Sequence, residues 1–349
     1  MSPTAPLEGV AGTAARARRG RRLTGTALRA AVTAAAAVLL VRKASLGEIF
    51  SRFAHADARW LVLGYLLAAG SILLTVAQWY GLLAAAAMRR SYRRCLRLEL
   101  AGDCFDAALP SSIGGDLLRA TRVAERPDEK VSGASAVVLR RLCNFPGMVL
   151  LLGAGLLACS GLPYLHRVLP VALGALGGGS ASIALSASPL FGRLARSPLC
   201  RRGPGRVLGK LFVALHDFRG KRRDLLVASL RGVAFWSVAI ASQACFIEAM
   251  GIHVPLDYAA VVITTTTALT MLPISLGGYG LREGSFAAFL AVAGHATAAE
   301  GAAVGVCLTV QMVALGLFGI PFLVTLRRGA RPEPVRAALA AAVASGEAA

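Results

Sequence analysis

The chain has 349 residues, 56% of them hydrophobic, and its mean hydropathy is +0.63. A soluble domain is usually about 45–50% apolar, so this composition excludes an ordinary soluble protein and indicates a polytopic membrane protein. The formal net charge is +20, but the basic residues lie between hydrophobic stretches, where they fit cytoplasmic loops facing anionic lipid. We therefore expect membrane lipids, and no nucleic acid, as partners.

Residues 1–25 are rich in arginine, and an apolar stretch at 27–41 follows them. This order resembles the basic and hydrophobic regions of a signal peptide. However, Arg42 and Lys43 follow at once, and no convincing small-residue cleavage site precedes them. We interpret residues 1–25 as a basic, disordered cytoplasmic terminus and 27–41 as a short first membrane helix, with cleavage as the alternative.

Six further stretches have the length and apolar content of membrane-embedded segments. They are 60–88, 132–160, 168–191, 225–250, 257–276 and 302–326. Together with the first helix and the re-entrant segments described below, they predict an all-α domain over residues 26–328 with about eight membrane-embedded segments. An Ala-rich cytoplasmic tail is expected at 329–349.

Basic residues are concentrated in some linkers and nearly absent from others. Residues 89–97 hold five arginines and residues 191–224 hold ten lysines or arginines, whereas 161–167 and 251–256 hold one and none. The positive-inside rule then places both termini and the linkers 89–97, 119–130 and 191–224 in the cytoplasm. Residues 42–59 do not fit, because they carry four basic residues on the predicted outer side.

The loop 191–224 contains apolar residues at helical spacing, flanked by basic residues. Val207, Leu208, Leu211, Phe212 and Leu215 form this apolar series. The pattern predicts an amphipathic helix, which either lies on the inner leaflet or packs on the cytoplasmic face of the protein itself.

Two stretches interrupt the hydrophobic pattern in almost the same residues. "LPSSIGGDLLR" covers 109–119 and "LPISLGGYGLR" covers 272–282, and the two share Leu, Pro, Ser, Gly, Gly, Leu and Arg. By the loop charges, residues 98–118 enter and leave from the cytoplasmic side, and residues 257–301 enter and leave from the outer side. This arrangement predicts an inverted repeat with two broken or re-entrant helices.

Proline and paired glycine are the residues expected where a helix breaks at membrane depth. These residues are Pro110, Gly114, Gly115, Pro273, Gly277 and Gly278. A helix that restarts after the glycines directs its free N–H groups at the break, which creates a site for an anion. Asp116 with Arg119, and Tyr279 with Arg282, are three residues apart, so each pair can share a helix face. The simpler alternative is a helix-breaking turn at the membrane surface.

The chain resembles the lysylphosphatidylglycerol synthase transmembrane region, a flippase-like family. The resemblance rests on the two motifs, read as "LPxxxGGDxxR" and "LPxSxGGxGxRE", and on an apolar segment with embedded arginine, "VVLRRLCNFPGMVLLL". It covers roughly residues 26–328 and implies translocation of an anionic or aminoacylated lipid between leaflets. A polyprenyl-linked lipid is a further candidate. Since the chain has no room for the family's aminoacyltransferase domain, we do not expect enzyme activity.

Four arginines are the candidates for binding a lipid headgroup, because arginine is permanently charged and bonds phosphate bidentately. Arg119 and Arg282 follow the glycine turns, and Arg140 and Arg141 lie about two turns into 132–160. One of this last pair is expected to face a cavity and the other to reach the interface. The family resemblance favours Arg140 for the cavity. Arg231 fits either role.

Acidic residues predict a polar cavity wall. Glu99, Asp103 and Asp106 are spaced by four and three residues and form one helical stripe. They either face solvent at the membrane surface, or pair with Arg140 or Arg141 or with a cationic headgroup. Asp116 belongs to the same candidate cavity, and Glu283 matches the family's "RE" and is placed to neutralise Arg282 locally.

The cysteines and histidines are scattered, and no cysteines form a CxxC pair, so no metal site, disulfide framework or cofactor is expected. A non-transporting partner of a lipid- or glycan-modifying membrane enzyme is the alternative function. The Ala-, Arg- and Gly-rich composition suggests a bacterial protein, and hence the plasma (inner) membrane.

Overall fold

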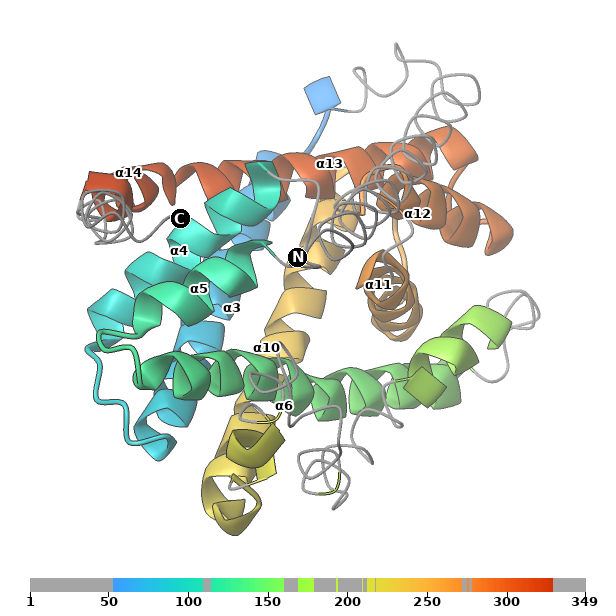
Figure 1. The fold of residues 1–349 in the computed structure, drawn as a ribbon. Helices are drawn as coiled ribbons and strands as arrows, with labels where there is room; N and C mark the ends of the chain where they lie inside the picture. The colour runs from blue at the N-terminus through green and yellow to red at the C-terminus, as the bar shows by residue number, and fades with distance from the viewer. Residues whose placement is uncertain are drawn as a thin grey trace, which may run out of the picture.

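The structure is a computed structural model that describes residues 53–108, 114–159, 169–178, 212–216, 218–271 and 278–328, and the single positions 193, 209 and 275. Within these residues the regular structure is entirely helical (Figure 1). The main helices are α3 (Ala58–Ala85), α4 (Tyr92–Ala108), α5 (Gly114–Val123), α6 (Glu129–Ala158), α10 (Arg222–Ala249), α11 (Leu256–Met271), α12 (Leu281–Val292), α13 (Ala298–Leu317) and α14 (Ile320–Arg328). The short 3₁₀ helix η3 (Phe218–Gly220) precedes α10.

Four of the described helices are long and apolar enough to cross a membrane: α3, α6, α10 and α13. The chain is therefore a multi-pass membrane protein. Helices α3, α6 and α10 begin and end within three residues of the stretches predicted at 60–88, 132–160 and 225–250. Of the stretch predicted at 168–191, residues 169–178 form a short apolar helix. The predicted first helix at 27–41, the basic terminus and the tail at 329–349 lie outside the described residues.

The stretch 302–326, predicted as one span, consists of two helices. Helix α13 ends at Leu317 and α14 begins at Ile320, with Gly319 between them. A Cβ atom at Gly319 would lie 1.9 Å from the carbonyl oxygen of Leu100 in α4, so the chain approaches α4 too closely for any side chain here. Pro321 in the first turn of α14 is compatible with a new helix start. Hydropathy alone does not register this division, because both helices are apolar.

The described part of the chain contains two successive series of four helices, and each series is interrupted between its second and third helix. Helices α3–α4–α5–α6 are followed by α10–α11–α12–α13, and in both series the break after the second helix coincides with one of the repeated motifs. Helices α3 and α10 have 28 residues each and pack along one another. Helix α6 packs on α10 and on α11 of the second series, and α13 packs on α12 and on α4 of the first. In Figure 1, α13 and α6 accordingly run along opposite sides of the bundle.

Polar bonds fix the pair α3–α10. The Ser242 hydroxyl donates to the Gly64 carbonyl at 2.7 Å, and Arg231 Nη1 donates to the Ala77 carbonyl at 2.8 Å. Residue numbers rise along α3 as they fall along α10, so the two helices are antiparallel. Arg231, whose role the sequence left open, therefore links two helices.

Part of the predicted cytoplasmic loop 191–224 packs on the protein itself. Leu215 and Phe218 are each only 4% exposed and belong to a core cluster with Trp79 and Leu82 of α3. For this part of the predicted amphipathic helix, the structure favours packing on the protein over lying on the lipid. Residues 207, 208 and 211 of the pattern lie outside the described residues.

Helices α6 and α10 cross through a pair of glycines. A Cβ at Gly147 would lie 2.7 Å from the carbonyl oxygen of Gly232, and a Cβ at Gly232 would lie 2.5 Å from the carbonyl oxygen of Cys143. Backbone atoms cannot move aside as a flexible side chain can. The crossing therefore depends on the absence of side chains at both positions.

Gly147→Ala is expected to destabilise the protein by about 1–3 kcal/mol, because the added methyl group overpacks the crossing. The measurement is thermal unfolding of the purified protein in detergent. Gly153→Ala, also in α6, is the matched control, since its Cβ would meet its nearest neighbour at 3.9 Å. Equal melting temperatures for the two variants would contradict this account of the crossing.

Candidate functional site

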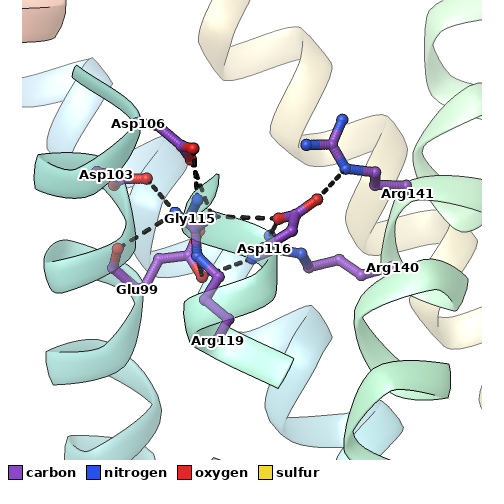
Figure 2. Close-up of polar contacts among 8 residues, drawn as sticks. All are labelled: Glu99, Asp103, Asp106, Gly115, Asp116, Arg119, Arg140 and Arg141. Atoms are coloured by element: carbon purple, nitrogen blue, oxygen red, sulfur yellow. Dashed lines mark hydrogen bonds and ion pairs between the residues drawn. The ribbon is translucent and has the colours of Figure 1, made fainter. Parts of the chain in front are cut away.

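The site is assembled from α4, which ends before the first motif, from α5, which begins within that motif, and from α6. Glu99, Asp103 and Asp106 lie on one face of α4, as their spacing predicted. Helix α5 restarts at Gly114 and carries Asp116 and Arg119 back toward that face (Figure 2).

Arg119 is at the centre of this group of charges. Its Nε lies 3.1 Å from Glu99, its Nη2 2.5 Å from Asp103, and its Nη1 3.2 Å from both Asp106 and Asp116. The side chain is only 3% exposed. Asp116 and Arg119 share a helix face as expected, but the guanidinium that we expected to bind a ligand is surrounded by four carboxylates of the protein.

The start of α5 is also held by α4. The Gly115 N–H donates to Asp106 Oδ1 at 2.7 Å, so this free N–H of the helix terminus is occupied by a protein carboxylate and not by a ligand anion. A Cβ at Gly115 would lie 2.2 Å from Asp106 Oδ2 and 2.5 Å from the Gly102 carbonyl oxygen. Glycine at this motif position therefore permits the close approach of α5 to α4.

The two arginines of α6 differ in their environments. Arg140 is 7% exposed, and its Nη atoms lie 2.5 Å from Glu99 and 3.3 Å from Asp116. Its guanidinium also lies over the ring of Trp79, with Cζ 5.7 Å from the ring centroid. Arg141 is 45% exposed and pairs with Asp116 through Nε. Arg140 points inward as expected, whereas Arg141 is more exposed but also lines the cavity beside Asp116, so the two do not divide between cavity and interface.

We call these seven residues the charge network: Glu99, Asp103, Asp106, Asp116, Arg119, Arg140 and Arg141. It contains four carboxyl groups and three guanidinium groups, which join α4, α5 and α6. Burying any of these charges without a partner is costly, so their mutual pairing lets them persist among apolar helices. Within the network, Asp103 and Asp106 are the most exposed acids, at 32% and 27%.

Two cavities adjoin the charge network. The first cavity has a volume of about 590 Å³ and is lined by network residues together with side chains of α3, α6, α10 and α11. The second cavity has a volume of about 360 Å³ and is lined by α3, α4, α10, α11, α12 and α13. Each is large enough for a small polar group with some hydrocarbon attached. Residues of α5, which begins within the first motif, line the first cavity, and residues of α12, which begins within the second motif, line the second.

The second motif forms a glycine-dependent turn before α12. Gly278 and Gly280 have φ values of 81° and 77°, which side-chain-bearing residues rarely adopt. Glu283 accepts a hydrogen bond from the Gly280 N–H at 2.6 Å and another from the Thr309 hydroxyl at 2.6 Å. Glu283 thus caps α12 and joins it to α13, and its carboxylate makes no direct ion pair with Arg282 in the described structure.

Arg282 has a sparse set of partners. Its nearest acceptors are the Thr309 hydroxyl, 3.4 Å from Nη1, and the Met312 sulfur, 3.7 Å from both Nη atoms. No carboxylate of the described residues lies within 4.0 Å of this guanidinium, which lines the second cavity. Arg119 and Arg282 occupy equivalent motif positions, yet of these two only Arg119 forms direct ion pairs with carboxylates of the described residues.

Tyr279 does not share a helix face with Arg282, contrary to the prediction from their spacing. The positive-φ glycines on either side place Tyr279 in the turn before α12 begins at Leu281. Its hydroxyl donates instead to the Ala107 carbonyl at 3.3 Å, which joins the second motif to the end of α4.

The structure does not place every predicted residue. Pro110, Pro273 and Gly277 lie outside the described residues. Sequence reasoning missed Gln243, which lines both cavities. A single glutamine in the apolar stretch 225–250 was the available signal, because polar residues at membrane depth are often functional.

Comparison with known proteins gives one family. The family model described as "Lysylphosphatidylglycerol synthase TM region" matches residues 26–321. Comparison with curated proteins gave no match. The matched range contains both motifs, the whole charge network and both cavities.

Proposed function

The chain belongs to the lysylphosphatidylglycerol synthase transmembrane-region family, and on that basis we propose that it translocates a lipid between the two leaflets of a membrane. The lipid is anionic, aminoacylated or polyprenyl-linked, and it is bound through its headgroup. The protein is a carrier and not an enzyme. The membrane is the bacterial plasma membrane, with both termini in the cytoplasm, which the distribution of basic linkers supports.

One observation carries this proposal: two adjoining cavities with charged walls lie inside a bundle of apolar helices. A charged headgroup cannot cross hydrocarbon without polar groups along its path, because ionised groups in the bilayer centre are costly. The cavities supply such groups, namely the charge network beside the first and Arg282 beside the second. The family's connection with lipid agrees with this use of the cavities.

We also propose that the helices α3–α6 and α10–α13 form an inverted repeat. The order of the helices supports it, since α3–α4–α5–α6 and α10–α11–α12–α13 correspond, and the first members of the two series are antiparallel. The reciprocal contacts, α6 with α11 and α13 with α4, agree with a two-fold relation between the series. Such a repeat allows the lipid-binding site to open alternately to either side of the membrane.

Reconstitution into lipid vesicles tests the function. Purified protein is placed in phosphatidylcholine vesicles that carry a trace of one labelled lipid. This lipid is phosphatidylglycerol or phosphatidylethanolamine labelled on an acyl chain, or a polyprenyl phosphate labelled on its isoprenoid chain. An impermeant reductant then quenches label in the outer leaflet. We expect quenching to exceed the outer-leaflet fraction for at least one of these lipids. In control vesicles, without protein or with an unrelated membrane protein, quenching should stop at that fraction. No exchange of any of them, together with co-purification of a membrane enzyme, would instead support the partner role.

A further inference from the structure

Five residues line both cavities. They are Ile72, Asp103, Asp106, Gln243 and Thr267, contributed by α3, α4, α10 and α11. We call them the shared wall. Because each of these residues lines both the first and the second cavity, the shared wall is where the two cavities meet within the described structure.

The arginines are divided by this wall. Arg119, Arg140 and Arg141 line only the first cavity, and Arg282 lines only the second. Within the described structure, the shared wall is therefore the direct route from one set of arginines to the other. Asp103 and Asp106 of the wall both pair with Arg119, which they share with Glu99 and Asp116.

Gln243 is the one neutral side chain of the wall whose hydrogen-bond donors have no partner among the described residues. It is partly exposed, and its amide has no hydrogen-bond partner among the described residues. By contrast, Gln78 donates to the Ala228 carbonyl at 2.8 Å, and Thr267 of the wall donates to the Ile263 carbonyl at 2.8 Å. An amide with both donor and acceptor is costly to leave unsatisfied among apolar helices, unless water or a ligand bonds to it.

We propose that the shared wall is the gate through which the headgroup moves between the cavities, and that the Gln243 amide bonds the headgroup as it passes. Ile72 and Thr267 line the gate and limit its width. Ile72 is apolar, and the Thr267 hydroxyl already donates to the Ile263 carbonyl, so neither donates a hydrogen bond to the headgroup. This inference rests on the proposed function and adds to it a defined route. It assigns to Gln243 a contact with the transported lipid that the arginines on either side do not make.

Narrowing the gate is expected to stop exchange while both cavities remain intact. Ile72→Phe and Gln243→Phe each add bulk to the shared wall, and each should reduce the initial rate of labelled-lipid exchange at least about tenfold, or about 1.4 kcal/mol in barrier. Gln243→Leu keeps a similar volume and removes the amide. It should slow exchange several-fold without blocking it. The assay is the vesicle experiment above, with the labelled lipid that the wild-type protein exchanges fastest.

Leu73→Phe is the matched control, since Leu73 is the neighbour of Ile72 on α3 but is 48% exposed and lines neither cavity. Thermal unfolding verifies that each variant is folded. The gate is supported if the wild-type protein and the Leu73→Phe variant exchange lipid while the Ile72→Phe and Gln243→Phe variants do not. Folded wall variants that exchange lipid as fast as Leu73→Phe overturn the gate but leave the proposed function standing. A wild-type protein that exchanges none of the lipids overturns the proposed function, and the gate with it.

Discussion

Arg119→Met is expected to lower the free energy of unfolding by about 3–5 kcal/mol, the usual cost of removing one partner from a buried ion pair. Arg119 is 3% exposed and lies within 3.2 Å of Glu99, Asp103, Asp106 and Asp116. Without it, four carboxyl groups face one another across α4 and α5, with only the α6 arginines to offset them. The loss should appear as a lower melting temperature in detergent and a lower yield of monodisperse protein.

Restoring the balance of charge provides the control. Adding Asp103→Asn and Asp106→Asn to Arg119→Met removes two of the uncompensated carboxylates at nearly constant volume, and the melting temperature should recover in part. If Arg119→Met melts like the wild-type protein and loses only lipid exchange, Arg119 is a headgroup ligand, as the sequence suggested, and not a structural centre.

Arg282→Met is expected to have the opposite profile: lipid exchange falls, and stability changes little. No carboxylate of the described residues forms a direct ion pair with this guanidinium, and the buried Glu283 beside it keeps its hydrogen bonds from the Gly280 N–H and the Thr309 hydroxyl when Arg282 is removed. Hydrogen bonds to a charged group contribute about 1.5–3 kcal/mol each, so the loss of a phosphate contact predicts a reduction in exchange of at least about tenfold. The initial exchange rate and the melting temperature are measured on the same preparation.

Two further variants make this result specific. Arg282→Lys keeps the charge but cannot bond phosphate bidentately, so its exchange rate should lie between those of wild type and Arg282→Met. Arg223→Met removes an exposed arginine at the start of α10 and should leave exchange unchanged. A strong loss of stability in Arg282→Met, with exchange per folded molecule unaltered, would show that Arg282 supports the fold instead.

Much of this architecture follows from local sequence. Helices α3, α6 and α10 were predictable because a membrane requires about 20 apolar residues, and the acidic stripe of α4 because helical spacing fixes which side chains share a face. The motifs likewise marked two helix breaks. These features depend on the residues themselves and on their near neighbours.

The roles of the two motif arginines were not predictable in the same way. Arg119 and Arg282 have nearly identical local sequences, but α4 presents three acids to Arg119, while Arg282 faces a hydroxyl and a thioether from α13. The division between α13 and α14 was also hidden, because it depends on the contact of Gly319 with Leu100. Such differences arise from which helices meet in space, and a single sequence does not specify that.

The charge network also bears on how the protein enters the membrane during synthesis. A single arginine at the centre of a helix raises the cost of insertion by about 2.5–3.5 kcal/mol, and α6 carries two in succession. Their carboxylate partners, Glu99 and Asp116, are on α4 and α5, which leave the ribosome before α6 does. The acids are therefore already available when the arginines reach the translocation machinery. The order of helices along the chain lets a nascent α6 be neutralised as it is inserted, before the second half of the protein has been made.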